Sequence, residues 1–340
     1  MAYQAVSIPR FYINALEWLM TIKAITVSDG NILGKAGNDI PAHFFYTLPV
    51  NPILWDNFTK ESNEIDIDNF KTVFGKNLFL AILGHNHNTA ENSPNLYFKN
   101  QPISFNGIVN DETGEEVISE YDGFTIGEIN ESEPQDFHYE NVNNIGSLIF
   151  GTYYDMKNAP NLSLTMSRDY GQSKEFTTYN GSSMSNTMAN KPPSWGSSLG
   201  AWELSTGSGV NQALSRSGRR SWDLKFSYMD DGDLWGVNQM LSTISPNTAQ
   251  QNIDIGYESG DVTGNVFNDS ILTDENFFSQ VWHKTLGGTL PFIFNPSGGG
   301  SNPNNNPDMY AICRFKENSL KATQSAFNVY DISVSIEEVW

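Results

Sequence analysis

Residues 327–336 read Phe-Asn-Val-Tyr-Asp-Ile-Ser-Val-Ser-Ile, and Glu-Glu-Val-Trp follows as far as position 340. Apolar and polar side chains alternate through this stretch, with one slip near Tyr330. Alternation at every second position is typical of a β-strand that buries one face. We therefore expect the C-terminal end of the chain to be built into an antiparallel sheet.

Two apolar stretches precede this strand and are also predicted to be strands. They are residues 290–294, Leu-Pro-Phe-Ile-Phe, and residues 309–315, Met-Tyr-Ala-Ile-Cys-Arg-Phe. The tract between them, residues 295–308, is dominated by Asn, Gly, Ser and Pro, and its composition predicts a flexible hairpin tip. Residues 219–229 alternate as well, which predicts a strand with one face formed by Trp222, Leu224, Phe226 and Tyr228.

The composition restricts the classes of protein to which the chain can belong. Its 340 residues are 39% hydrophobic, 17% charged and 13% aromatic. Abundant Asn, Ser, Thr and Gly beside many aromatic residues are typical of all-β proteins with many turns. The formal net charge of −20 argues against binding to nucleic acid phosphates or anionic lipid. The single cysteine, Cys313, lies in an alternating stretch and is expected to be a small core residue.

Short apolar runs recur between turn signals in the first part of the chain, at residues 78–83, 96–98, 123–127 and 145–150. Such spacing predicts a β-sandwich or jelly roll. A shift of composition at Gly151 predicts two domains, residues 1–151 and 152–340, with the option that the first ~20 residues join the second domain. Residues 169–209 are rich in Ser, Gly, Thr, Asn and Pro and are predicted to be a long loop.

One helix is predicted, at residues 274–286. Apolar side chains recur there at helical spacing, Thr273 and Asp274 are candidate N-terminal caps, and Gly287 follows as a stop. Residues 11–20 fit either a short helix or an extended stretch. The predicted fold is all-β, mainly antiparallel, with one short helix: a jelly-roll or β-sandwich module and a second domain that is a β-barrel or β-sandwich.

Two groups of residues have the composition of metal ligands. His85 and His87 fall on the same side of an extended chain and could contribute to a zinc site, but no further ligands accompany them at metal spacing, so a polar turn is the preferred interpretation. Asp230, Asp231 and Asp233 surround a glycine and could hold calcium, although a solvated turn is again preferred. No metal or other cofactor is predicted.

Two further groups are candidates for binding. Sugar sites in β-sandwich modules combine an aromatic platform with Asn, Asp or His side chains, and the candidate glycan-binding residues are His85, Asn86, His87 and Tyr121. Arg216, Arg219 and Arg220 form the only basic patch, which fits either an acidic neighbour or local carboxylates. Because no nucleophile elbow, phosphate-binding loop or defensible acid pair is present, we do not expect an enzyme.

Several of these segments resemble proteins of bacteriophage tails. Residues 79–87, Phe-Leu-Ala-Ile-Leu-Gly-His-Asn-His, are similar to the strand and turn of galactose-binding-like jelly rolls, and residues 145–151 to the last strand of that module. The C-terminal half resembles distal-tail and minor-tail proteins in the order of its segments: a Gly-rich excursion, the Arg-rich strand at 219–226, a short helix, the strand at 288–294 and a Glu-Val-Trp end. Those proteins usually begin with the ring-forming barrel, whereas here the jelly-roll-like part comes first.

The resemblance implies a structural component of a virion tail, synthesised in the host cytoplasm. The second domain would then be of the tail-hub type. It would form a homo-oligomeric ring, hexameric or trimeric, at the tail tip or distal tail. There it would connect tail tube and tail-tip proteins and contribute to host attachment through a surface glycan. Neither specific nucleic acid binding nor membrane insertion is expected, and the three arginines are expected at a subunit contact. The alternative is a carbohydrate-binding receptor-recognition module without a role in ring formation.

Overall fold

The computed structural model confirms the predicted fold class. It describes residues 6–22, 47, 53–54, 77–83, 95–98, 103–105, 108–110, 124–129, 137–140, 144–145, 147–189, 218–235, 274–304 and 309–339. The fold is mostly antiparallel sheet, with 48% strand and 14% helix. Three helical segments are present in this part of the chain: α1 (Ala15–Thr21), α3 (Asp231–Leu234) and η4 (Phe278–His283).

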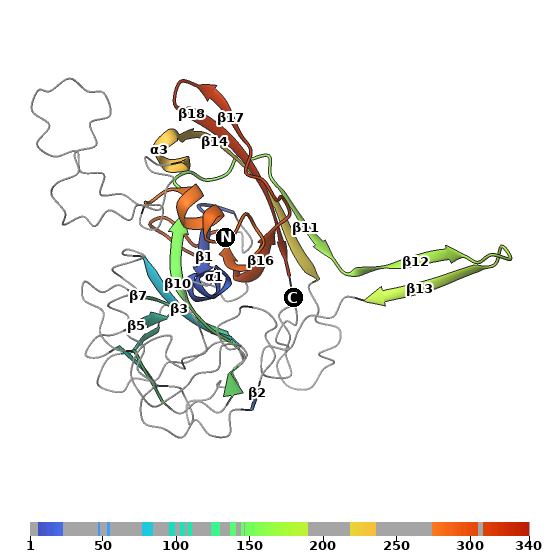
Figure 1. The fold of residues 1–340 in the computed structure, drawn as a ribbon, viewed down its shortest axis with the longest axis horizontal. Coiled ribbons are helices and arrows are strands. Elements are labelled where there is room, and N and C mark those ends of the chain that lie inside the picture. The colour runs from blue at the N-terminus through green and yellow to red at the C-terminus, as the bar shows by residue number, and fades with distance from the viewer. Residues whose placement is uncertain are drawn as a thin grey trace, which may run out of the picture.

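Most strands belong to one large sheet, in the order β11-β14-β18-β16-β15-β1-β10-β3-β7-β5-β6, with β17 paired to β18 (Figure 1). Three separate pairs, β12–β13, β2–β9 and β4–β8, complete the described strands. The bounds of the strands are β1 (Arg10–Asn14), β2 (Ile53–Leu54), β3 (Leu78–Leu83), β4 (Asn95–Phe98), β5 (Ile103–Phe105), β6 (Ile108–Asn110), β7 (Phe124–Ile129), β8 (Phe137–Glu140), β9 (Asn144–Ile145), β10 (Ser147–Asp155), β11 (Thr165–Asp169), β12 (Gly171–Thr177), β13 (Ser183–Ala189), β14 (Arg219–Asp230), β15 (Phe292–Asn295), β16 (Ala311–Phe315), β17 (Ala322–Ala326) and β18 (Val329–Glu338).

The N-terminal strand β1 lies inside this sheet. It pairs with β10 on one edge and with β15 on the other, so residues 10–14 lie beside a strand from the C-terminal part of the chain. Residues 11–20, which fitted either a short helix or an extended stretch, form some of each. Strand β1 ends at Asn14, and helix α1 begins at the next residue. Gly151, the expected domain boundary, lies within β10, which is continuous from Ser147 to Asp155. The division into two domains stays a prediction.

Alternate side chains of the central strands enter two apolar clusters. Phe11 and Ile13 of β1 join one cluster, and Tyr12 joins the other. Because successive side chains of a strand point to opposite faces, the two clusters cover the two faces of the sheet. The first cluster is densely aromatic, with the Phe292 and Phe315 rings 4.7 Å apart between centroids. The same cluster holds Cys313, which is fully buried as predicted.

The predicted strand at 219–229 is present as β14. The prediction that four of its side chains share one face is wrong for one of them. Trp222, Leu224 and Phe226 are buried, whereas the Tyr228 side chain is 80% exposed. The register against β18 shifts between Phe226 and Met229, so Met229 takes the buried position. A β-bulge inserts one extra residue and reverses the alternation. Tyr228 adopts the left-handed conformation there, with φ of 60°.

The predicted helix at 274–286 is present over a shorter range, as the wide helical turn η4. Its first turn is capped by the Asn276 side chain, which accepts a hydrogen bond from the Ser279 N–H at 2.8 Å. Of the two expected caps, Thr273 lies outside the described residues, and Asp274 precedes Asn276 by two positions. Gly287 ends it as predicted, since its N–H donates to the Trp282 carbonyl at 2.9 Å and its φ is 65°. Phe277 and Val281 bury the apolar face in the first cluster.

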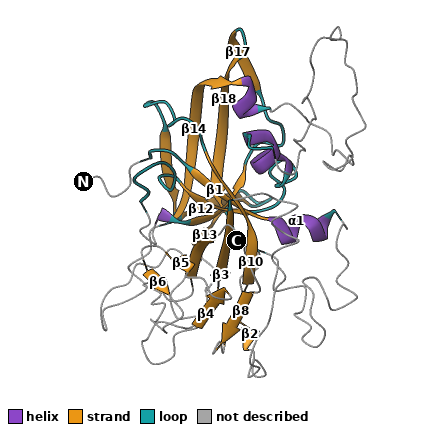
Figure 2. Cartoon of the chain, turned by 90° about the vertical axis from the view of Figure 1, so that its left-hand side faces the viewer, coloured by secondary structure: helices purple, strands orange, loops and turns teal. Residues whose placement is uncertain are grey.

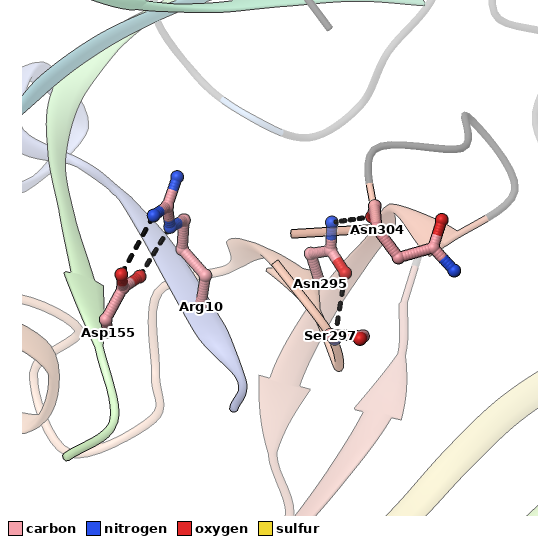
Figure 3. Close-up of polar contacts among 5 residues, drawn as sticks. All are labelled: Arg10, Asp155, Asn295, Ser297 and Asn304. Atoms are coloured by element: carbon pink, nitrogen blue, oxygen red, sulfur yellow. Dashed lines mark hydrogen bonds and ion pairs between the residues drawn. The ribbon is translucent and has the colours of Figure 1, made fainter. Parts of the chain in front are cut away.

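The glycine-rich tract after β15, predicted to be a flexible tip, is packed through residue 299. The Asn295 amide donates to the Asn304 carbonyl at 2.9 Å, and its oxygen accepts from the Ser297 N–H at 3.0 Å (Figure 3). The Gly299 N–H donates to the Ile8 carbonyl at 2.9 Å. A Cβ at Gly299 would lie 2.7 Å from the Ile8 side chain, so glycine is needed for this close approach. Backbone and amide hydrogen bonds order the tract in place of apolar contacts.

Arg10 anchors the neighbouring end of β1 (Figure 3). Its guanidinium forms a bidentate ion pair with Asp155, in which Nη2 donates to Oδ2 at 2.8 Å and Nε to Oδ1. The same group lies 4.4 Å from the centre of the Tyr153 ring. Because the Arg10 side chain is only 8% exposed, this pairing satisfies a charge that would be costly to leave alone.

A buried lysine links η4 to β10. The Lys284 Nζ donates to Gln280 Oε1 at 2.6 Å and to Thr152 Oγ1 at 3.4 Å. Both acceptors are neutral, and the side chain is fully buried. Burial therefore lowers the pKa of Lys284 to about 7, because the apolar surroundings disfavour the ammonium form.

We expect Gly151→Ala to destabilise the protein by about 3 kcal/mol, because the added methyl group overpacks the β1–β10 contact. A Cβ at this position would lie 1.8 Å from the Ile13 carbonyl oxygen, which is backbone and cannot swing away. Urea unfolding measures the change. Gly232→Ala in α3 is the matched control, since its Cβ meets nothing within 4 Å, and equal stability of the two variants would contradict the close approach.

We also expect the free energy of unfolding to rise with pH above about 7, where folded Lys284 is neutral and the unfolded lysine still binds a proton. This gain in the free energy of unfolding is lost as the pH falls toward 7. The slope of the free energy of unfolding against pH is at most about 1.4 kcal/mol per pH unit. Denaturation at pH 7 and pH 9.5 measures it against Lys284→Met, which removes this slope. Lys321→Met, at an exposed position, retains it; a Lys284→Met slope equal to the wild-type slope would contradict the assignment.

Candidate functional site

The described feature most suited to contact another molecule is a hairpin arm formed by β12 and β13. It projects away from the large sheet (Figure 1). The seven residue pairs of the arm run from Gly171 opposite Ala189 to Thr177 opposite Ser183. Every side chain described between positions 174 and 186 is exposed except Thr178, which is half-buried. The sequence predicted a long loop at 169–209, and the regular hairpin at 171–189 corrects that prediction for this range. Residues 190–209 lie outside the described part of the chain.

The tip of the arm is a tight turn at residues 178–182. The Thr178 carbonyl accepts a hydrogen bond from the Gly181 N–H at 2.8 Å, and the Thr178 N–H donates to the Ser182 carbonyl at 2.8 Å. Gly181 has a φ of 80°, which other residues adopt only with strain. Asn followed by Gly is the strongest short-range signal for such a turn. Asn180-Gly181 was therefore the feature that could have predicted the arm.

The register gives the arm two different faces. Phe176 lies opposite Met184, and Lys174 lies two residues away on the same face. The other face pairs Glu175 with Ser185 and, next to the tip, Thr177 with Ser183. The Phe176 and Met184 side chains are 55% and 61% exposed. We call the face that carries Phe176, Met184 and Lys174 the apolar face of the arm.

The arm is electrically neutral within a strongly acidic chain. Residues 165–189 contain two basic and two acidic side chains, Arg168 and Lys174 against Asp169 and Glu175, whereas the whole chain has a formal net charge of −20. A two-stranded ribbon with both faces in water is marginally stable at best. A neutral ribbon with one apolar face is therefore suited to dock on a partner, which would complete its packing.

Strand β11 leads into the arm and is held by β14, which a buried ion pair fixes in the sheet. The Arg220 guanidinium donates from Nε to Glu338 Oε1 at 2.8 Å and from Nη2 to the Tyr310 carbonyl at 2.7 Å. The Arg220 N–H also donates to Glu338 Oε2 at 2.6 Å. The Glu338 side chain is completely buried. This contact joins β14 to the last residues of β18, directly beside the strand that carries the arm.

The three arginines proposed for a subunit contact differ in how far the structure describes their surroundings. The Arg220 guanidinium pairs with the buried Glu338 carboxylate of its own chain, which fits the interpretation that the arginines satisfy local carboxylates. Arg219 is partly buried on the same strand, and Arg216 lies outside the described residues. For all three arginines the subunit contact stays a prediction.

The candidate glycan-binding residues His85, Asn86, His87 and Tyr121 all lie outside the described part of the chain. The three aspartates considered for calcium lie at the end of β14 and in α3. Across the residues that the structure describes, no three His, Cys, Asp or Glu side chains gather in a way that could hold a metal ion.

Asn14 caps α1, and a buried carboxylate, that of Glu17, lies beside this cap. The Asn14 side chain accepts from the Glu17 N–H at 3.1 Å, and Glu17 Oε2 accepts from the Thr47 hydroxyl at 2.7 Å and from its N–H at 3.0 Å. Burial raises the pKa of Glu17, and the bonds from Thr47 oppose this rise. All three groups are buried, so they stabilise the start of the helix and offer no open chemistry.

Comparison of the chain with protein-family models, curated proteins and solved structures found no match. In the described segments, no helix has the length and apolar character needed to span a bilayer.

We expect Arg220→Met to lower the free energy of unfolding by about 3–5 kcal/mol, because it leaves the buried Glu338 carboxylate without its partner. Adding Glu338→Met to the same protein should recover much of the loss. Lys225→Met on the same strand is the control: its exposed pair with Asp331 spans 4.0 Å, so its effect should stay under about 1 kcal/mol. Denaturant unfolding of these proteins and of Glu338→Met alone measures the coupling, and additive losses in the double variant would contradict it.

Proposed function

We propose that this chain is a structural subunit that assembles with copies of itself through the β12–β13 arm. The observation that carries the proposal is the arm itself, a regular hairpin that exposes Phe176 and Met184 on one face and hydroxyl side chains on the other. Burial of two large apolar side chains in a partner would supply the packing that the isolated ribbon lacks. The arm is therefore an assembly element.

The distribution of charge supports a second copy as the partner. Two copies with a net charge of −20 each repel one another, and the repulsion is smallest where a neutral surface forms the contact. The arm is such a surface. Contact of an arm with a different surface of the next copy is a head-to-tail interface, and such interfaces close into rings when the rotation between subunits permits.

The proposed location of this ring is the tip of a bacteriophage tail, between the tail tube and the tip proteins. The support is the order of segments in the C-terminal half, in which the Arg-rich strand, the helical turn and the strand at 288–294 follow one another as in distal-tail and minor-tail proteins. An acidic ring also suits a path for DNA, because phosphates are not held by a surface rich in carboxylates.

The test is the mass of the particle in solution. We expect the wild-type protein to form a closed oligomer in size-exclusion chromatography with light scattering, and rings in electron micrographs. Phe176→Ser with Met184→Ser should raise the concentration needed for assembly about 30-fold or more, as loss of a binding hot spot does.

The control alters the opposite face of the same hairpin. Thr177→Ala with Ser183→Ala changes a cross-strand pair that faces away from Phe176, and it should leave assembly unchanged. A wild-type protein that stays monomeric at all concentrations would refute the proposed function. Assembly that is unaffected by loss of the arm would refute the role of the arm.

A further inference from the structure

Strands β14, β17 and β18 extend together beyond the rest of the sheet (Figure 2). Their far end, residues 228–231 and 326–329, is here called the ribbon end. Two aromatic side chains are exposed there, Tyr228 at 80% and Phe327 at 87%. The Asp231 N–H donates to the Asn328 carbonyl at 3.0 Å, so the two segments are joined directly.

Tyr228 adopts a backbone conformation that is unfavourable for a tyrosine. Its φ is 60°, in the left-handed region where Gly, Asn and Asp are the usual residues. The backbone is fixed there because the Tyr228 N–H donates to Asp331 Oδ1 at 3.2 Å and the Tyr228 carbonyl accepts from the Asn158 amide at 3.4 Å. The ring itself projects into solvent. A strained residue that exposes an aromatic ring is explained better by an external contact than by folding.

The charges around the ribbon end are mainly acidic. Asp230 and Asp231 follow the bulge directly, and Asp331 lies opposite it. Lys225 lies 4.0 Å from Asp331, and Lys157 lies 4.0 Å from Asp233 of α3. Each lysine offsets one carboxylate, so the charges of Asp230 and Asp231 remain. The apolar face of the arm has the opposite sign, since Lys174 lies on it while Glu175 points to the other face. The two surfaces therefore match in both aromatic character and charge.

We propose that the apolar face of the arm of one copy docks on the ribbon end of the next copy. Phe176 and Met184 pack against Tyr228 and Phe327, and Lys174 approaches the acidic group beside them. This inference rests on the proposed function, because it names the partner surface for the same arm. Arm-on-arm and end-on-end contacts are disfavoured, since each would bring like charges into one interface. The contact is therefore head-to-tail.

A mixing experiment with two double variants tests this arrangement. The arm variant carries Phe176→Ser and Met184→Ser, and the end variant carries Tyr228→Asn and Phe327→Ser. Asn suits the left-handed backbone at 228 better than Tyr, and all four side chains are exposed, so both variants should unfold at the wild-type temperature. Each variant by itself should be monomeric, whereas an equimolar mixture should form a one-to-one dimer and nothing larger, because only one intact arm and one intact ribbon end remain.

Charge reversal gives a second readout. Lys174→Glu should weaken assembly about tenfold or more, and combining it with Asp230→Lys and Asp231→Lys should restore it. If the end variant assembles as well as the wild type does, the ribbon end is not the docking site, and the proposal that the arm mediates assembly still stands. A wild-type monomer would instead refute the proposed function, and failure of the arm variant and the end variant to form a dimer would exclude the head-to-tail contact.

Discussion

The close approach of β1 to β10 is the constraint on which the rest of the sheet depends. At Gly151 the two backbones are so near that the Ile13 carbonyl occupies the space of any side chain. Strand β10 carries β3, β7 and β5 on its far edge, and β1 carries β15, β16, β18 and β14 on its own. Within the described strands these two groups pair only through β1 and β10. Five residues that are buried on both faces therefore hold two sets of strands in one sheet.

Paired polar side chains fix the margins of this sheet. The Arg10–Asp155 pair secures the end of β1, and the Asn295 amide closes the glycine-rich tract on Asn304. Arg220 with Glu338 joins β14 to the end of β18. Buried polar groups of this kind are costly unless every member has its partner. The described part of the protein thus places its buried ion pairs where strands must keep one position, whereas the arm has no net charge.

Alternating patterns could be predicted from the sequence, and exceptions to alternation could not. The strand at 327–336 was predicted because apolar and polar residues alternate there, and it is present as β18 from Val329, after a turn at Phe327 and Asn328. Tyr228 was placed on the wrong face because a bulge leaves no mark in the pattern. The tract at 295–308 was predicted to be flexible because composition reports apolar content and not hydrogen bonds to a distant segment such as Ile8. The arm was missed as a structure, although its Asn-Gly turn was visible, because its strands are polar. The ribbon end depends on contacts between β14 and β18, which no local pattern contains.

The position of β1 sets a condition on synthesis. Ser7 and Ser297, whose hydroxyl groups are in hydrogen-bond contact, are 290 positions apart along the sequence, so the first strand leaves the ribosome long before β15 exists. Until then β1 lacks one neighbour, and its apolar side chains have no complete core to enter. Sheets whose paired strands are far apart in sequence have a high contact order. They fold slowly, and their strand edges stay unpaired until the partner strands are made. The nascent polypeptide therefore depends on protection from aggregation, by chaperones or by its own acidic charge, through most of its translation.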